Sequence, residues 1–275
     1  MARIPKLEPI APRVWLLRGG VPRAMNAYLI EDGDGVVVYD TGEKSMAGPI
    51  AAAAERMGGL TQVVLGHADT DHRGAAAALS ALAPVVCHPD AVTEAQGAGG
   101  RTYWDMSKLA PPIRLAHRAL HRWVWDGGPV HISATVRGGD TIADFEVIEL
   151  PGHAPGLIGL WRAADRVALV SDCFYLTTMW GRPTAARVPD PAYNLDTQQA
   201  RRSIAALAAL DPLVAAPGHL GPLTGTTVRA ELEHAAVDGC PAEERAGADR
   251  DDPRLLRVRR HRGVWRGNRS DSAGT

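Results

Sequence analysis

Two histidines and two aspartates occupy six positions of the segment GHADTDHRG, which directly follows the apolar run VVL. Imidazole and carboxylate groups are the ligands that zinc and first-row transition metals commonly take from proteins. Because side chains alternate along an extended chain, His67 and Asp69 are expected to point the same way. Asp71 and His72 follow where the chain must turn into an alanine-rich helix. The segment therefore predicts a metal site, with an ordinary turn and a helix cap at Asp71 as the alternative.

Three more histidine or aspartate residues follow apolar runs elsewhere in the chain. His153 lies in ELPGHAPG, Asp172 in LVSDCF and His219 in VAAPGHLGP. A single histidine after a strand is more often a capping or core residue than a ligand. Three separate strand ends of this kind are difficult to explain in that way. Open α/β sheets carry their sites at the carboxyl ends of strands, which strengthens the prediction of a metal site.

The segments that must position these side chains alternate between strands and helices. Runs rich in Val, Ile and Leu, bounded by Gly, Pro and Asp, predict strands, and EDGDG predicts a hairpin turn at 31–35. Alanine-rich stretches between them predict helices, and this alternation is typical of layered α/β proteins. Strands are expected at 13–18, 26–31, 36–40, 61–66, 84–88, 130–136, 144–150, 156–162, 166–172 and 212–217, and helices at 46–57, 73–82, 197–210 and 226–237.

Two regions depart from this alternation. Residues 91–126 carry apolar side chains at helical spacing and are rich in tryptophan, which predicts a helical insertion. The insertion could pack on the core, cover the metal site as a lid that includes Trp104, or do both. The last part of the chain is polar, rich in arginine and without periodicity. We therefore expect one domain over residues 1–240 and a basic, disordered tail over 241–275.

The composition argues against several classes of protein. Lys and Arg number 30 against 31 Asp and Glu, and the net charge of −1 gives no reason to expect nucleic acid as a partner. No apolar run approaches the roughly 20 residues of a membrane-spanning helix, and a secretory signal is not evident. Three cysteines are too few for a disulfide framework. We expect a cytoplasmic protein with a small-molecule substrate and no nucleic-acid or membrane partner, and a homodimer stays open.

Five motifs, in order along the chain, resemble those of the metallo-β-lactamase-fold superfamily, including its glyoxalase II-like metallo-hydrolases, over residues 12–237. The resemblance implies an α/β protein with the αββα sandwich, in which two β-sheets pack face to face with helices outside. It also implies a binuclear metal site at one edge. The motifs are YDTG (39–42), GHADTDHRG (66–74), PGHAPGLIGL (151–160), SDCFY (171–175) and PGH (217–219).

The resemblance also assigns the metal ligands. Asp40 would support the ligand loop without binding metal, although an ordinary turn residue after its strand is an equally good interpretation. One metal would take three ligands, the other would take three more, and a seventh would bridge both. These are, in that order, His67, Asp69 and His153; Asp71, His72 and His219; and Asp172.

These ligands predict hydrolysis of an ester, thioester, lactone or amide bond. Two divalent cations that share a water lower its pKa, so a bridging hydroxide would serve as the nucleophile. Asp71 could accept and pass on the proton. Tyr175 or Tyr193 could polarise the substrate through its hydroxyl, with ordinary packing as the alternative. We therefore predict a metal-dependent hydrolase with two divalent metal ions, expected to be zinc.

Asp69 departs from the common HxHxDH pattern and gives HxDxDH instead. A carboxylate in place of an imidazole adds a negative charge and favours harder metals, so iron and manganese stay open. Members of the superfamily with a carboxylate at this position include diiron oxygenases, and a diiron redox enzyme is therefore the alternative function. A metal-binding fold without catalysis is a third interpretation, against which the complete set of seven ligand-capable residues counts.

Overall fold

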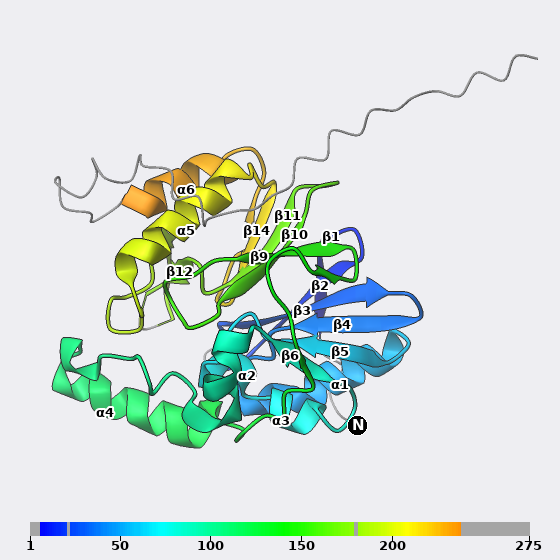
Figure 1. Cartoon of the computed structure of the whole chain (residues 1–275), viewed down its shortest axis with the longest axis horizontal. Helices are drawn as coiled ribbons and strands as arrows, with labels where there is room; N and C mark the ends of the chain where they lie inside the picture. The colour runs from blue at the N-terminus through cyan, green and yellow to red at the C-terminus, as the bar shows by residue number, and fades with distance from the viewer. Residues whose placement is uncertain (1–5, 21–22, 179–180, 238–275) are drawn as a thin grey trace, which may run out of the picture.

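The computed structural model describes residues 6–20, 23–178 and 181–237, so the predicted tail at 241–275 lies outside the described residues. Two β-sheets stack face to face, and helices cover the outer face of each (Figure 1). This four-layer αββα arrangement confirms the predicted fold class. In the part of the chain that is described, no helix is long and apolar enough to cross a membrane.

The first sheet has seven strands that are adjacent in chain order. Its first four strands form an antiparallel meander, and the turn that joins Asp32 to Gly35 is the one predicted from EDGDG. From β4 onward the strands run parallel, so β4 and β5 end at the same edge, where Asp40 and His67 follow them. The strands are β1 (Leu7–Ala11), β2 (Val14–Gly19), β3 (Met25–Asp32), β4 (Gly35–Tyr39), β5 (Leu60–Val64), β6 (Val85–Cys87) and β7 (Ala134–Thr135).

The second sheet has six strands in the order β15-β14-β11-β10-β9-β8. Its neighbours β11 and β14 run parallel, and Ser171 pairs with Pro217 at their carboxyl ends. Asp172 and His219 therefore follow two strand ends that lie side by side. A separate hairpin, β12 with β13, comes directly after β11. The strands are β8 (Thr141–Ile142), β9 (Phe145–Glu149), β10 (Ile158–Arg162), β11 (Val167–Ser171), β12 (Tyr175–Thr177), β13 (Pro183–Arg187), β14 (Val214–Pro217) and β15 (Leu223–Thr224).

Each sheet carries its own pair of covering helices. Helices α1 and α3 pack on the first sheet, and α5 and α6 pack on the second (Figure 1). Helix α4 belongs to the predicted insertion and lies to one side of the sandwich. The helices are α1 (Ala47–Arg56), α2 (Thr70–Arg73), α3 (Ala76–Leu79), α4 (Pro111–Leu120), α5 (Thr197–Ala209) and α6 (Val228–Val237), with short helical turns η1 (Lys44–Met46), η2 (Pro89–Ala91), η3 (Glu94–Ala98), η4 (Met106–Lys108) and η5 (His121–Trp125).

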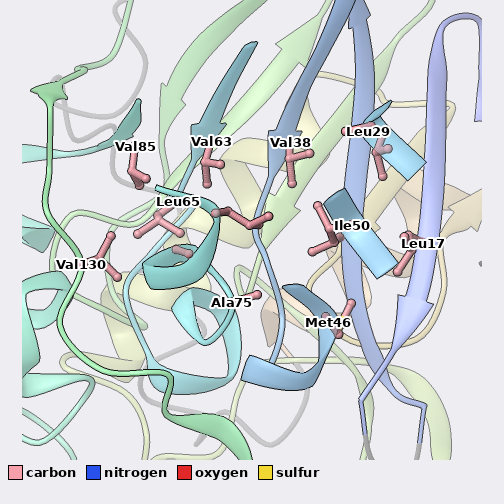
Figure 2. Packing of buried hydrophobic residues seen from close by; sticks show 14 of the residues in the cluster. Leu17, Leu29, Val38, Met46, Ile50, Val63, Leu65, Ala75, Val85 and Val130 are labelled. Carbon is pink, nitrogen blue, oxygen red and sulfur yellow. The ribbon is translucent and has the colours of Figure 1, made fainter. Parts of the chain in front are cut away.

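Three hydrophobic layers hold the sandwich together, and β3 contributes to two of them. Ala27 and Leu29 pack between the first sheet and its helices, whereas Tyr28 and Ile30 face the second sheet. All four side chains are fully buried, because a sheet covered on both faces needs an unbroken apolar run. Figure 2 shows the outer layer, where Ile50 of α1 packs close to Leu29. Burial of a side chain such as Leu29 contributes about 1.5–3 kcal/mol.

Some boundaries differ from the sequence prediction. The helix predicted over 73–82 is wrong in its extent, because the chain forms two short helices, α2 and α3, on either side of Gly74. A β-carbon at Gly74 would lie 2.3 Å from the carbonyl oxygen of Trp125, so the insertion passes too close for any larger residue. The strand predicted over 130–136 shrinks to β7, and β1 and the β12–β13 hairpin are not among the predicted elements.

Candidate metal centre

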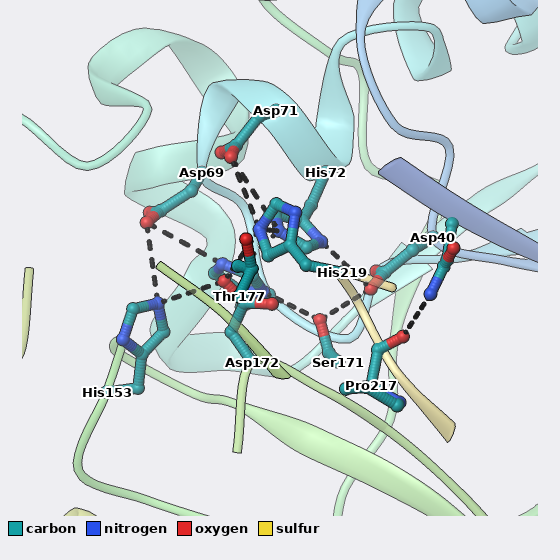
Figure 3. A network of polar contacts seen from close by, with 12 residues as sticks. Asp40, Asp69, Asp71, His72, His153, Ser171, Asp172, Thr177, Pro217 and His219 are labelled. Carbon is teal, nitrogen blue, oxygen red and sulfur yellow. Dashed lines mark hydrogen bonds and ion pairs between the residues drawn. The ribbon is translucent and has the colours of Figure 1, made fainter. Parts of the chain in front are cut away.

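Seven histidine and aspartate side chains meet at the edge where strands of both sheets end (Figure 3). Four of them come from the turn after β5 and from α2, and the others follow β9, β11 and β14. Six are buried, and Asp71 is partly exposed. The structure thus brings together every residue predicted to bind metal: His67, Asp69, Asp71, His72, His153, Asp172 and His219.

The first three-residue cluster, which we call the Asp69 group, consists of His67, Asp69 and His153. Asp69 Oδ2 lies 3.6 Å from His67 Nε2 and 3.8 Å from His153 Nε2. The ligand atoms of the group all lie within 4.8 Å of one another. Two imidazoles and one carboxylate at these distances form a set of donors that a divalent cation can bind.

The second cluster, which we call the Asp71 group, consists of Asp71, His72 and His219. Asp71 Oδ2 lies 3.6 Å from His219 Nε2 and 4.0 Å from His72 Nε2. The two imidazole Nε2 atoms are 3.2 Å apart. This group also offers one carboxylate and two imidazoles within 4.8 Å.

Asp172 lies between the two groups. Its Oδ2 atom is 3.3 Å from the Nε2 atoms of both His72 and His219, and 3.7 Å from His153 Nε2. A carboxylate in this position can bind a cation in either group, as predicted for a bridging ligand. Gly218 makes room for it, because a β-carbon there would lie 2.4 Å from Asp172 Oδ1 and 2.2 Å from His72 Cε1.

Hydrogen bonds to the outer ring nitrogens fix how three of the histidines face the centre. Ser171 Oγ lies 2.5 Å from Asp40 Oδ2, and because a carboxylate only accepts, the serine donates to it. The same hydroxyl must then accept from His67 Nδ1, which is 2.9 Å away. In the neutral imidazole of His67, Nε2 then carries the lone pair that a metal ligand requires.

Asp40 and Asn194 act in the same way on the other two histidines. Asp40 Oδ2 accepts from His72 Nδ1 at 3.2 Å, while its Oδ1 accepts from the backbone amide of Gly66 at 2.7 Å. Asn194 donates through Nδ2 to the carbonyl of Pro189, so its Oδ1 accepts from His153 Nδ1 at 3.0 Å. Asp40 thus supports the ligand loop, in agreement with its expected role.

The turn that carries His219 is attached to β3. The side chain of Asn26 donates to the carbonyls of Pro217 and Leu220 at 2.8 and 2.6 Å, and Tyr28 donates to Pro217 at 2.5 Å. The backbone amide of Asn26 also donates to the backbone carbonyl of Gly218 at 2.9 Å. This turn therefore bridges the two sheets at the metal centre.

Several inward-facing atoms lack a hydrogen-bond partner. His67 Nε2, His153 Nε2 and Asp172 Oδ1 are buried atoms with no hydrogen bond to the rest of the described chain. Leaving such atoms unsatisfied costs about 1–3 kcal/mol each, so buried polar atoms are normally bonded to something. Buried ligand-type atoms without a hydrogen bond, on residues from three different strand ends, fit a bound metal.

The electrostatics of the centre also favour a cation. Burial raises the pKa of Asp172, but the imidazoles of His219 and His72 outweigh burial and hold it well below its usual range. Burial lowers the pKa of His72, but Asp172 and Asp71 outweigh burial and raise it well above its usual value. The carboxylates thus draw positive charge into a buried site, and divalent cations would supply that charge in place of protons.

Asp69 is held by the insertion. The hydroxyl of Tyr103 lies 2.6 Å from both carboxylate oxygens, and Trp104 Nε1 donates to Oδ2 at 3.1 Å. The capping alternative fails for Asp71, because α2 begins at Thr70 and the N-cap position belongs to Asp69. The carboxylate of Asp69 caps no backbone amide. These residues therefore serve the centre and not the start of the helix.

A cavity of about 320 Å³ opens onto the centre, and both predicted catalytic tyrosines line it. The ring of Tyr175 lies 5.9 Å from that of His153 and 5.6 Å from that of His219. Burial raises the pKa of Tyr175 well above its usual value, so its hydroxyl stays protonated and can donate. Tyr193 stacks on His117 of the insertion at 5.3 Å and lies farther along the wall.

Four residues of the site were not assigned these roles from the sequence. Ser171 and Asn194 orient ligand histidines, and Tyr103 and Trp104 bind Asp69. The serine adjoins Asp172 and the asparagine adjoins Tyr193, so proximity to a predicted ligand or to a predicted catalytic tyrosine was the signal available. The lid interpretation of the insertion placed Trp104 near the metals but did not predict its hydrogen bond.

The fold and the centre together define a class of protein: an αββα sandwich with a histidine- and aspartate-rich site for divalent metals at one edge. The sequence profile of the metallo-β-lactamase superfamily matches residues 20–219. The chain therefore belongs to the metallo-β-lactamase superfamily, whose members include metal-dependent hydrolases.

Several known proteins are similar to this chain. A probable metallo-hydrolase, YflN of Bacillus subtilis (strain 168), is 29% identical over 114 residues, which cover 38% of this chain and 43% of that protein. The metallo-β-lactamase family protein TTHA1429 of Thermus thermophilus shares the fold at 22% identity, with a TM-score of 0.61 over 83% of this chain and 80% of that chain. The protein TTHA1623, crystallised in a di-iron-bound form, is 25% identical, with a TM-score of 0.53 over 83% of this chain and 97% of that chain.

Proposed function

We propose that this protein is a metal-dependent hydrolase that cleaves an ester, thioester, lactone or amide bond of a small molecule. The observation that carries the proposal is the set of seven histidines and aspartates whose inward atoms face one centre beside a cavity of about 320 Å³. A cavity of this size suits a small molecule. The similarity to a probable metallo-hydrolase supports the same class of reaction.

Two divalent cations, expected to be zinc, would be held by the Asp69 group and the Asp71 group, with Asp172 shared between them. Bound there, they would lower the pKa of a water and polarise the oxygen of the scissile bond. The residues of the chain would supply the rest of the chemistry. Asp71 lines the cavity with a partly exposed carboxylate, so it can accept a proton and return it to the leaving group.

Tyr175 would act on the substrate directly. Its ring lies against the rings of His153 and His219 and lines the cavity, so its protonated hydroxyl would donate to a carbonyl oxygen that gains negative charge. Tyr193 would contact the part of the substrate that lies toward the insertion. We also propose a cytoplasmic location and leave a homodimer open, with no nucleic-acid or membrane partner.

The proposal can be tested by metal analysis combined with a substrate panel. Protein purified without added metal should contain about two zinc ions per chain and should hydrolyse members of a panel of aryl esters, thioesters and lactones. Tyr175→Phe should lower kcat on the best substrate by about a hundredfold, as expected for loss of one donor to a developing oxyanion, while metal content stays the same. A protein that holds zinc but cleaves no member of the panel would contradict the proposal.

A diiron redox enzyme is the second candidate, and one specific feature favours it. Asp69 gives its group two imidazoles and a carboxylate, a donor set that iron accepts well. The 25% identical TTHA1623 was crystallised with two irons. Iron in place of zinc in the purified protein, together with an absorption band that changes with oxygen or reductant, would favour this candidate over the hydrolase.

A further inference from the structure

One basic side chain on the cavity wall has no partner. Arg187 of β13 is the one arginine or lysine among the described residues that line the cavity. Its guanidinium forms no hydrogen bond or ion pair within the described part of the chain. Arg73 and Arg162, by contrast, are buried and are paired with Asp126 and Asp165. A guanidinium has five N–H donors and no acceptor, so the donors of Arg187 must bond to water or to a ligand.

Arg187 lies beside the metal centre. It is the direct cross-strand partner of Tyr175 in the β12–β13 hairpin. Side chains of such partners project from the same face of a β-ladder and contact each other. Since the ring of Tyr175 lies 5.9 Å from His153 and 5.6 Å from His219, Arg187 belongs to the wall next to the ligands. A group that it binds would lie close to the scissile bond.

The part of the wall that the insertion contributes is aromatic. Trp104 meets His117 edge to face at 4.9 Å, and Trp125 meets the same imidazole at 5.3 Å. Tyr193 stacks on His117 from another side. All four residues line the cavity, and Leu120 adds an aliphatic side chain. This wall suits an aromatic or aliphatic group, whereas the β12–β13 hairpin presents a cation.

We infer that the substrates of this site are amphipathic acids, in which a single carboxylate binds Arg187 and an apolar group packs on the aromatic wall. The inference rests on the proposed hydrolysis and specifies its substrate class. The planar guanidinium fork matches a carboxylate in two parallel hydrogen bonds. Asp190 also lines the cavity and one guanidinium balances one negative charge, so a carboxylate suits this wall better than a group with two negative charges.

The experiment compares aryl esters that share one leaving group. One is a butyrate ester, the second is a glutarate monoester with a free terminal carboxylate, and the third carries a phosphonate in place of that carboxylate. The metal-loaded protein should prefer the glutarate monoester over the butyrate ester in kcat/KM by about tenfold to hundredfold, the range of a hydrogen-bonded charged pair. Arg187→Gln should bring this preference close to one, chiefly through KM.

Arg182→Gln is the matched control, because Arg182 precedes the same strand but is exposed and does not line the cavity. It should retain the preference. Calorimetric titration with two methyl ketones that replace the ester group, one with the terminal carboxylate and one without it, gives a readout that does not require turnover. The ketone with the carboxylate should bind more tightly, and Arg187→Gln should remove the difference. Thermal unfolding of both variants checks that they are folded.

The outcomes separate the inference from the proposed function. Equal kcat/KM values for the butyrate and glutarate esters, unchanged in Arg187→Gln, would overturn the inference and leave the hydrolase intact. Binding of the carboxylate-bearing ketone that depends on Arg187, without hydrolysis of any ester, would support the carboxylate site and contradict the hydrolase. Preference for the phosphonate ester over the glutarate monoester would overturn the assignment of a single carboxylate.

Discussion

The Asp69 group and the Asp71 group use the same donors, one carboxylate and two imidazoles, but different parts of the molecule support them. In the Asp69 group the carboxylate is 4% exposed and accepts hydrogen bonds from Tyr103 and Trp104 of the insertion. In the Asp71 group the carboxylate is partly exposed to the cavity, and within the described residues no hydrogen bond of the protein reaches it.

The Asp71 group is therefore supported by the sandwich alone, whereas the Asp69 group also depends on the insertion. Asp40 orients His72, and the turn attached to β3 carries His219. Both supports belong to the edge where the strands of the two sheets end. Asp69 instead accepts hydrogen bonds from Tyr103 and Trp104, which belong to the insertion. Hydrogen bonds of this kind fix the orientation of a metal ligand, so the insertion helps to position the Asp69 carboxylate.

The substitution with the largest expected effect is one that weakens metal binding in both groups. Asp172→Asn keeps the shape of the side chain but removes the charge that the two groups share. We expect the affinity of the protein for zinc to fall at both groups by more than roughly a hundredfold, beyond the usual effect of losing a supporting residue. Competition titration against a chromophoric chelator measures the affinities, and hydrolysis of the best ester should be lost in parallel.

Asp190→Asn is the control for this variant, because Asp190 lines the same cavity but is not one of the seven. It should bind zinc as the wild type does. If Asp172→Asn lost only one of the two metal ions, the shared position of Asp172 would be wrong, and the two groups would be independent.

Local patterns allowed the alternation of strands and helices and the seven candidate side chains to be predicted, whereas the αββα layers were implied by the resemblance to the superfamily. His67, His153 and His219 each follow an apolar strand, and a strand that ends at a sheet edge delivers the next side chain there. The contacts that distinguish the two groups are not local. Ser171 and His67 are 104 positions apart, and Tyr103 and Asp69 are 34 apart. Only the folded chain brings such pairs together.

A second prediction addresses the Asp69 group alone. Tyr103→Phe removes the hydroxyl that lies 2.6 Å from both oxygens of Asp69. We expect one zinc ion to bind about tenfold to a hundredfold more weakly, the usual range for loss of a supporting residue, while the other is unchanged. In an Asp69→His background the same substitution should have little effect, because the phenol would then have no carboxylate to which it could donate.

Tyr193→Phe provides the control, since this tyrosine lines the cavity and stacks on His117 without a hydrogen bond to Asp69. Zinc affinity should be unchanged. A loss of affinity in Tyr103→Phe that persisted at full size in the Asp69→His background would show that the tyrosine acts by packing the insertion and not through Asp69.

The smallest effect is expected from Trp104→Phe. The bond from Trp104 Nε1 to Asp69 is longer than that of Tyr103, at 3.1 Å, and phenylalanine preserves an aromatic ring beside His117. Loss of one ordinary hydrogen bond should weaken zinc binding in the Asp69 group by about fivefold. Titration of this variant beside Tyr103→Phe ranks the two donors. If Trp104→Phe had the larger effect, the ranking of the two donors by the length of their hydrogen bonds to Asp69 would be wrong.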